Sequence, residues 1–200
     1  MTMRRITHSV GRTRSRRAVG LFGWMVPLSS LFANGAFGAD PQVTEGFINA
    51  PVAEVWQVFT TSEGYKATGV AQATVDLRIG GEIRSNYDPR GRLGDPGTIV
   101  NEILAYEPQR MLAIRIKQAP AGFPHKDAIP GTWSVLYFNP AGDNMTQVRI
   151  VGLGYTDTPA SQAMRKFFED GNRATLDQIA KRYWPKCARC EKEGAAGATP

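Results

Sequence analysis

The feature that most constrains the fold is a long amphipathic segment near the end of the chain, from Thr158 to Trp184. Its first residues, Thr158-Pro159, are typical of a helix N-terminus, and Pro185 marks the end because proline cannot continue the helical hydrogen bonds. Gly171 lies between two apolar stripes, so we expect a bend or a change of packing partner there. A helix of this kind needs a concave apolar surface to lie in. The stripes are Ala160, Ala163, Met164, Phe167, Phe168 and Ala174, followed by Leu176, Ile179 and Tyr183.

The chain before this helix alternates apolar and polar residues in a way that predicts about seven strands. Two short helical segments are expected after the first strand, one beginning at Ala50-Pro51 and one around Tyr65. Gly80-Gly81 indicates a tight hairpin turn. The pattern predicts an α+β domain in which a curved antiparallel sheet wraps around the terminal helix, and the space left between them becomes core or ligand pocket. The predicted strands are 42–49, 74–79, 82–87, 98–106, 112–117, 132–138 and 146–155.

Residues 1–39 have the composition of an export signal. Six arginines and no carboxylate come first, the apolar run 18–37 follows, and Gly38 and Ala39 suit cleavage by signal peptidase. A retained membrane anchor is the alternative, although glycines, a proline and serines interrupt the run. Arg16-Arg17 also resembles a twin-arginine signal. We therefore expect a periplasmic or secreted domain over residues 40–185, without stable membrane insertion once the signal is removed.

The formal net charge of +6 does not indicate a nucleic-acid partner. Of the 24 basic residues, six are the arginines of the predicted signal. The remaining chain therefore holds 18 basic and 18 acidic residues and is formally neutral.

Residues 186–200 predict a flexible tail that carries a Cys-x-x-Cys pair, Cys187 and Cys190. A haem attachment would need histidine at position 191, where Glu191 stands, and a zinc site would need two further ligands. A redox role lacks the surrounding βαβ pattern, so in an oxidising compartment we expect a local disulfide. No metal site and no cofactor are predicted.

The order of one strand, two short helices, six strands and a long helix resembles the SRPBCC or START-like helix-grip superfamily. Over about residues 42–184, the chain resembles the branch related to activators of the heat-shock ATPase. The resemblance implies a cavity for an apolar or aromatic small molecule between the sheet and the last helix. The superfamily also hosts lipid carriers, receptors, cyclases and co-chaperone modules, so the fold does not choose among functions. The stretches that carry the resemblance are 48–56, 76–84, 105–112 and 167–171.

One departure from this branch bears on the cavity. The branch usually carries tryptophan directly after the central glycine of the helix, and this chain has Asn172. Asn172 either faces the cavity as a polar anchor or meets water at a bend. Strand aromatics likewise either line the pocket or fill the core. The residues predicted to line the cavity are Tyr87, Trp133, Tyr137, Phe168, Asn172 and Leu176.

No catalytic motif is recognisable in the sequence. His125 lies in a proline-rich loop and is either a general base at the cavity mouth or a solvated surface histidine. Glu102 and Arg115 lie on adjacent predicted strands, where they form either an exposed ion pair or an internal pair facing a substrate carbonyl.

Three functions are compatible with these observations. The first is an exported, non-enzymatic protein that binds a small hydrophobic or aromatic molecule under the terminal helix. The second is an enzyme resembling polyketide cyclases and dehydratases, with His125 or Glu102 as acid or base. The third is a protein-interaction module that uses the outer face of the sheet, for which a large exposed apolar patch would be the sign.

Overall fold

The structure, a computed structural model, describes residues 40–184. The predicted export signal and the Cys187/Cys190 pair lie outside the described residues. Among residues 40–184, no helix is both long and apolar enough to cross a membrane. The elements are β1 (Gln42–Ile48), α1 (Val52–Thr60), α2 (Ser62–Tyr65), the 3-10 turn η1 (Lys66–Thr68), β2 (Gln72–Val75), β3 (Glu82–Asn86), β4 (Ile99–Glu107), β5 (Met111–Gln118), the 3-10 turn η2 (Lys126–Ala128), β6 (Trp133–Gly142), β7 (Met145–Leu153) and α3 (Pro159–Arg182).

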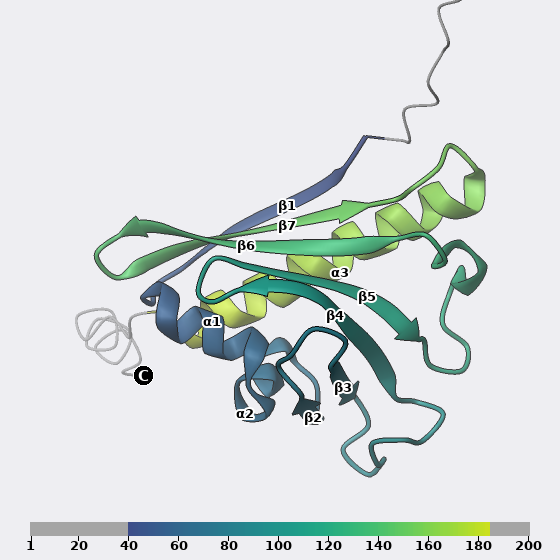
Figure 1. Cartoon of the computed structure of the whole chain (residues 1–200), viewed down its shortest axis with the longest axis horizontal. Helices are drawn as coiled ribbons and strands as arrows, with labels where there is room; N and C mark the ends of the chain where they lie inside the picture. Colours follow the sequence, from purple (N-terminus) through teal and green to yellow (C-terminus); the bar gives the residue numbers. More distant parts are fainter. Residues whose placement is uncertain (1–39, 185–200) are drawn as a thin grey trace, which may run out of the picture. The chain divides into compact units, whose positions relative to one another are not determined.

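The strands form one antiparallel sheet in the order β1-β7-β6-β5-β4-β3-β2. Strands β2 to β7 are neighbours in chain order, and β1 pairs with β7, which makes β1 and β2 the edges. The sheet curls around α3, which contacts β1 and β7 as well as both 3-10 turns (Figure 1). This is the α+β helix-grip architecture that the sequence predicts, and the seven strands are confirmed.

The two ends of α3 agree with the sequence pattern. The Thr158 side chain caps the first turn by accepting a hydrogen bond from the Ser161 backbone N–H, and Pro159 is the first helical residue. Ser161 in turn accepts a hydrogen bond from the Thr156 backbone N–H at 2.9 Å, which fixes the entry of the chain. The helix continues without interruption through Gly171 and ends at Arg182.

Two apolar clusters hold α3 at its two ends. The main cluster fills the space between the sheet, α1 and the second half of α3, where Leu176 and Ile179 are buried. The smaller cluster surrounds Met164 in the first half of α3, and Phe168 packs against it. The middle of the helix, around Asn172, belongs to neither cluster.

Strand β1 approaches α3 closely because its inner face is small and polar. A Cβ atom built on Gly46 would lie 3.2 Å from Leu176 Cβ and Cδ1. Gln42 and Thr44 also face inward and are almost fully buried. The apolar residues Val43 and Phe47 point outward, and Phe47 is 57% exposed, whereas Ile48 at the end of the strand is buried in the main cluster.

Two local predictions need correction. The predicted strand 74–79 ends at Val75, and residues 76–81 form the connection to β3. The tight turn lies one residue earlier than predicted: the Gly81 backbone N–H donates to the Arg78 carbonyl at 2.8 Å, so Ile79 and Gly80 are its central residues.

Two glycine substitutions test the close approach of β1 to α3. We expect Gly46→Ala to lower the free energy of unfolding by about 1–3 kcal/mol, because Leu176 Cβ is fixed to the helix backbone and cannot rotate away. Gly171→Ala should instead raise it by roughly 0.5–1 kcal/mol, because an added Cβ meets nothing within 4 Å and alanine favours a helix interior. Urea denaturation of both variants measures these changes. Equal effects of the two substitutions would show that β1 and α3 are not in close contact.

Candidate functional site

A cavity of about 370 Å³ lies between the concave face of the sheet and the middle of α3. Phe168, Asn172 and Thr175 form its helix wall, between the two core clusters. Protein cores leave few voids larger than a water molecule, and this volume lies within the roughly 300–1,000 Å³ range of small-molecule pockets. The cavity is therefore the candidate functional site.

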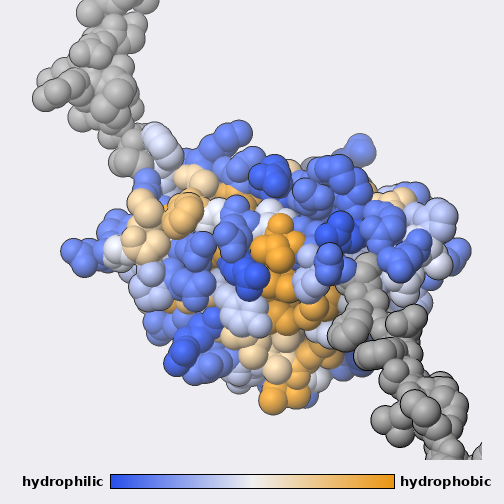
Figure 2. All heavy atoms as spheres, turned by 90° about the horizontal axis from the view of Figure 1, so that it is seen from above, coloured by the Kyte–Doolittle hydropathy of each residue, from blue (hydrophilic) through white to orange (hydrophobic). Residues whose placement is uncertain are grey.

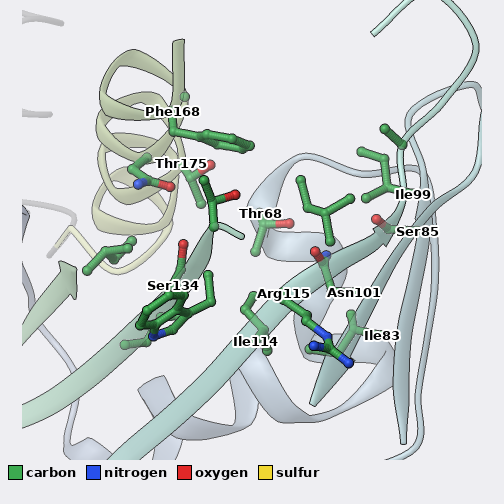
Figure 3. A pocket seen from close by; sticks show the side chains of 18 of the residues that line it. Thr68, Ile83, Ser85, Ile99, Asn101, Ile114, Arg115, Ser134, Phe168 and Thr175 are labelled. Carbon is green, nitrogen blue, oxygen red and sulfur yellow. The ribbon is translucent and has the colours of Figure 1, made fainter. Parts of the chain in front are cut away.

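The sheet side of the cavity is a belt of aliphatic side chains. Residues at alternate strand positions point to the same face, so several strands each contribute inward residues to one wall. Figure 3 shows Ile83 and Ile114 on this wall, with Phe168 and Thr175 on the helix opposite. The members of the belt are Ile83, Leu112, Ile114, Ile116, Leu136 and Ile150.

Polar side chains gather where α2, η1, β3 and β4 meet the cavity. Ser85 and Asn101 are buried on neighbouring strands, and Ser85 pairs with Ile99 while Asn101 pairs with Ile83, so the two polar residues are diagonal neighbours. Tyr65 also lines the cavity, and its hydroxyl interacts with the Asn101 side chain. Burial raises the pKa of Tyr65 to about 12, with a smaller contribution from Tyr87, so its hydroxyl is protonated at neutral pH. Thr68 completes this group and donates its hydroxyl hydrogen to the Tyr65 carbonyl.

The helix wall carries a second polar position at Asn172. Its amide donates a hydrogen bond to Gln42 Oε1 at 3.3 Å, and the Gln42 amide donates to Thr44 Oγ1 at 2.5 Å. This chain of side chains runs from the cavity to the buried inner face of β1. Tyr155 also lines the cavity, and burial raises the pKa of its hydroxyl to about 12.

Aromatic side chains stand between the loop 119–132 and the first half of α3. The ring of Phe123, in the loop, lies 5.2 Å from the Phe167 ring and 6.2 Å from the Phe168 ring, measured between centroids. All three residues line the cavity. Phe167 is 39% exposed, so this aromatic group borders the solvent.

Four of the six predicted lining residues border the cavity in the structure. Phe168 and Asn172 do so from α3, Tyr87 from the residue after β3, and Trp133 from the start of β6. Tyr87 and Trp133 are also exposed to solvent. Of the two alternatives for Asn172, the geometry places it at the cavity rather than in open solvent.

The other two predicted lining residues, Tyr137 and Leu176, do not border the cavity. Tyr137 lies on the outer face of β6, because the inward residues of that strand are Leu136 and Phe138. Leu176 is 3% exposed and packs into the main core cluster against Gly46.

The two candidate acid or base residues also lie away from the cavity. His125 is an exposed loop residue with a left-handed backbone conformation at the start of η2. Glu102 accepts from Arg115 in an ion pair with an Nη2–Oε2 distance of 2.8 Å. Of the two arrangements considered for Glu102 and Arg115, the structure has the exposed cross-strand ion pair. Neither His125 nor Glu102, the residues proposed for a cyclase-like enzyme, lies at the cavity.

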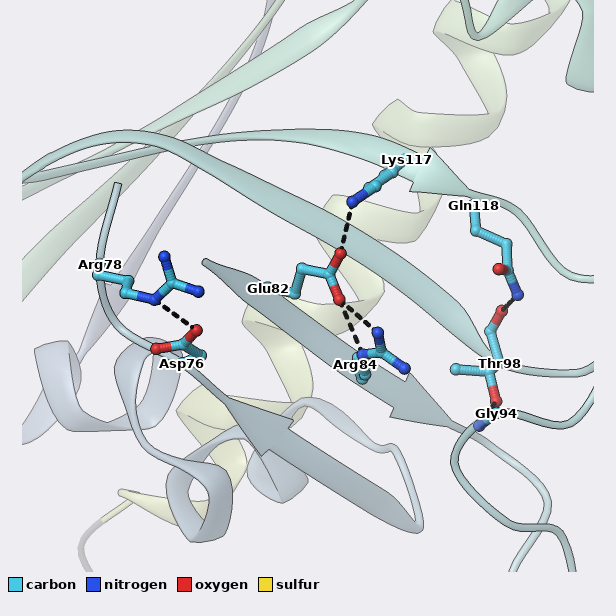
Figure 4. Close-up of polar contacts among 8 residues, drawn as sticks. All are labelled: Asp76, Arg78, Glu82, Arg84, Gly94, Thr98, Lys117 and Gln118. Carbon is cyan, nitrogen blue, oxygen red and sulfur yellow. Dashed lines mark hydrogen bonds and ion pairs between the residues drawn. The ribbon is translucent and has the colours of Figure 1, made fainter. Parts of the chain in front are cut away.

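Charged residues are concentrated on the outer face of the sheet. Glu82 bridges Lys117 and Arg84, at 2.7 Å and 2.6 Å (Figure 4). The hydrogen bonds from Lys117 and Arg84 hold the pKa of the Glu82 carboxyl below its usual range, and Lys117 has the larger effect. Arg115 is the one charged residue among those that line the cavity, and its guanidinium is paired with Glu102. Residues 40–184 contain no cluster of three or more acidic, histidine or cysteine side chains that could hold a metal ion.

The polar residues Tyr65, Ser85 and Asn101 were not among the cavity residues predicted from the sequence. The signal available for Asn101 was a polar amide in the middle of an otherwise apolar strand segment. Tyr65 gave no periodic signal, because it lies in a four-residue helix that continues into a 3-10 turn.

The hydrogen bond of Asn172 is testable through stability. We expect Asn172→Leu to lower the free energy of unfolding by about 1–3 kcal/mol, because the buried Gln42 carbonyl loses its donor. Asn139→Leu, at an exposed site, is the matched control and should change it by less than about 0.5 kcal/mol. Chemical denaturation gives both values. An unchanged stability for Asn172→Leu would show that the amide pair does not hold β1 to α3.

Several solved structures share this fold. A protein from Nitrosomonas europaea is 20% identical, with a TM-score of 0.52 over 78% of this chain and 96% of that chain. A protein from Mycobacterium smegmatis is 18% identical, with a TM-score of 0.54 over 73% and 91%. The Aha1 dimer from Colwellia psychrerythraea is 15% identical, with a TM-score of 0.51 over 70% and 96%. At these identities the likeness shows the fold alone. The comparison with curated proteins finds no match.

The family comparison covers nearly the whole described domain. Residues 49–183 match the family described as activator of Hsp90 ATPase homolog 1-like proteins, from the end of β1 to the C-terminus of α3. This agrees with the helix-grip fold and with the branch that the sequence motifs resemble. The chain therefore belongs to the family of activator of Hsp90 ATPase homolog 1-like proteins.

Proposed function

We propose that this protein is an exported carrier or receptor that binds a small, mainly apolar molecule in the cavity under α3. The observation that carries the proposal is the cavity itself, about 370 Å³ between the sheet and α3 and open to solvent beside Phe167. Most of the lining is apolar, and a bound apolar molecule would remove this surface from water.

The design of α3 supports this function. The helix is anchored by Met164 in one cluster and by Leu176 and Ile179 in the other. Between the anchors it presents Asn172 and Thr175, whose side chains are too small to fill the space in front of them. The void thus depends on which residues face the sheet at mid-helix, and a bulky side chain there would fill it.

The export part of the proposal rests on the sequence of residues 1–39. The arginine-rich start, the apolar run and the small residues before Asp40 are those of a cleaved signal. A periplasmic or secreted carrier would meet apolar molecules outside the cytoplasm. The mature domain would begin near Asp40, just before β1.

Native mass spectrometry of the protein purified from its own host tests the proposal. We expect a protein mass that begins near Asp40, with an additional non-covalent mass that disappears on denaturation. A neutral fluorescent probe, N-phenyl-1-naphthylamine, should bind the purified domain. Ser134→Trp, on the inner face of β6, should weaken its binding at least about tenfold by filling the cavity.

Tyr137→Trp is the matched control, because it enlarges an outward residue of the same strand. It should leave probe binding unchanged. Ser134→Leu is a smaller substitution, useful if the tryptophan variant does not fold. The proposal would be contradicted if the protein retained no additional mass and the folded domain bound no probe.

A second candidate function is association through the outer face of the sheet. Val43, Val151 and Val135 occupy neighbouring rungs of β1, β7 and β6 on this face. Val43 is 41% exposed, and Tyr137, which lies on β6 with Val135, is 38% exposed. Figure 2 shows one face of the domain on which hydrophobic side chains gather between hydrophilic ones. Because the similar structure from Colwellia psychrerythraea is described as a dimer, the partner proposed here is a second copy of the chain.

Sedimentation velocity tests this association. A dimer formed through the apolar face should dissociate in Tyr137→Glu, because a carboxylate would be buried without a partner. We expect the apparent dissociation constant to rise at least about tenfold. Lys181→Glu, at an exposed position on α3, is the charge control and should not change it. A monomeric wild-type protein at all concentrations would exclude the dimer.

A further inference from the structure

The polar side chains of the cavity are not scattered over its wall. Figure 3 shows Thr68, Ser85 and Asn101 facing one another, with Phe168 and Thr175 across the cavity from them. Tyr65 belongs to the same group, because it lines the cavity and its hydroxyl interacts with Asn101. The cavity therefore has one polar end, which we call the Tyr65 end, and an aliphatic middle.

The groups at the Tyr65 end are neutral hydrogen-bonding groups. Tyr65 offers a hydroxyl donor, Asn101 offers an amide donor and acceptor, and Ser85 offers a hydroxyl that can do either. The Thr68 hydroxyl hydrogen is already donated to the Tyr65 carbonyl at 2.7 Å. Two donors, Tyr65 and Asn101, can thus converge on one acceptor oxygen of a ligand.

No charge is placed to receive an ionised ligand. The lining contains no carboxylate, lysine or histidine, and its Arg115 is already paired with Glu102. In Figure 3 the Arg115 side chain points away from α3. Burying an ionised group without a partner is costly, so this lining discriminates against acids and amines.

We infer that the cavity selects an uncharged molecule with a flat or aliphatic body and one carbonyl or hydroxyl oxygen bound by Tyr65 and Asn101. The body extends along the belt of Ile83, Ile114 and Leu136 toward Phe168. This inference rests on the proposed function, because it assigns the ligand class to the same cavity.

Three naphthalene probes of similar shape test the inference. They are 2-acetylnaphthalene, which carries a neutral carbonyl, 2-ethylnaphthalene, which lacks it, and 2-naphthoate, which carries a charge. We expect wild-type protein to bind the ketone about 3- to 10-fold more tightly than the hydrocarbon, the range given by one net hydrogen bond. The naphthoate should bind at least about tenfold more weakly than the ketone. Fluorescence titration and calorimetry give the dissociation constants.

Tyr65→Phe removes only the hydroxyl. It should weaken ketone binding about 3- to 10-fold and leave hydrocarbon binding unchanged, which a general loss of packing would not do. Asn101→Leu should have the same selective effect and serves if Tyr65→Phe is misfolded by circular dichroism. Tyr106→Phe, on β4 but outside the cavity lining, is the matched control and should alter neither affinity.

The outcomes separate the two proposals. If all three probes bind but neither Tyr65→Phe nor Asn101→Leu reduces the preference for the ketone, the inference is wrong and the binding function stands. Tighter binding of the naphthoate than of the ketone would also overturn it. If no probe binds the folded wild-type protein and no molecule is retained from the host, both proposals fail.

Discussion

The packing of α3 against a strongly curved sheet is the interaction on which the rest of this domain depends. The helix is held at its two ends by separate apolar clusters, one around Met164 and one around Leu176 and Ile179. Gly46 allows β1 to approach the second cluster within van der Waals distance. A helix that is held at both ends against a concave sheet leaves space at its middle unless large side chains fill that space. Asn172 and Thr175 do not fill it, so the cavity follows from the way the helix is anchored.

The two faces of the sheet differ in charge, with ion pairs on the outer face and mainly neutral side chains on the inner face. Glu82 and Glu102 are opposite each other on β3 and β4, and their repulsion is offset by Arg84, Lys117 and Arg115 on the same outer face. Exposed pairs of this kind add little to stability, but they keep charged groups of the central strands in solvent. The inner face is therefore free to combine aliphatic residues with neutral polar ones, which is what a selective pocket for an uncharged molecule requires.

Local patterns in the sequence predict most of the fold and only part of the site. The N-cap at Thr158 and the alternation of the strands rest on short-range rules, and the predicted helix ends and strand number are confirmed. The face of β6 was assigned wrongly because both of its faces are hydrophobic: Tyr137 points out and Phe138 points in, and alternation alone cannot tell the two apart. The burial of Gln42 depends on Asn172, which lies 130 residues later in the chain. The Tyr65 end likewise combines residues of α2 and β4, so it could not be predicted from any single stretch of the sequence.

The cavity also ties ligand occupancy to the stability of the whole domain. Native domains are stable by only about 5–15 kcal/mol, so a core that leaves part of its volume unfilled gives up a sizeable share of that margin. A ligand that binds only the folded state returns stability, by about 2.7 kcal/mol when present at 100 times its dissociation constant. The contacts it restores lie between the sheet and the middle of α3, the one stretch of the helix that neither cluster holds. A bound molecule of the proposed class would therefore contact both clusters and connect them through the middle of α3.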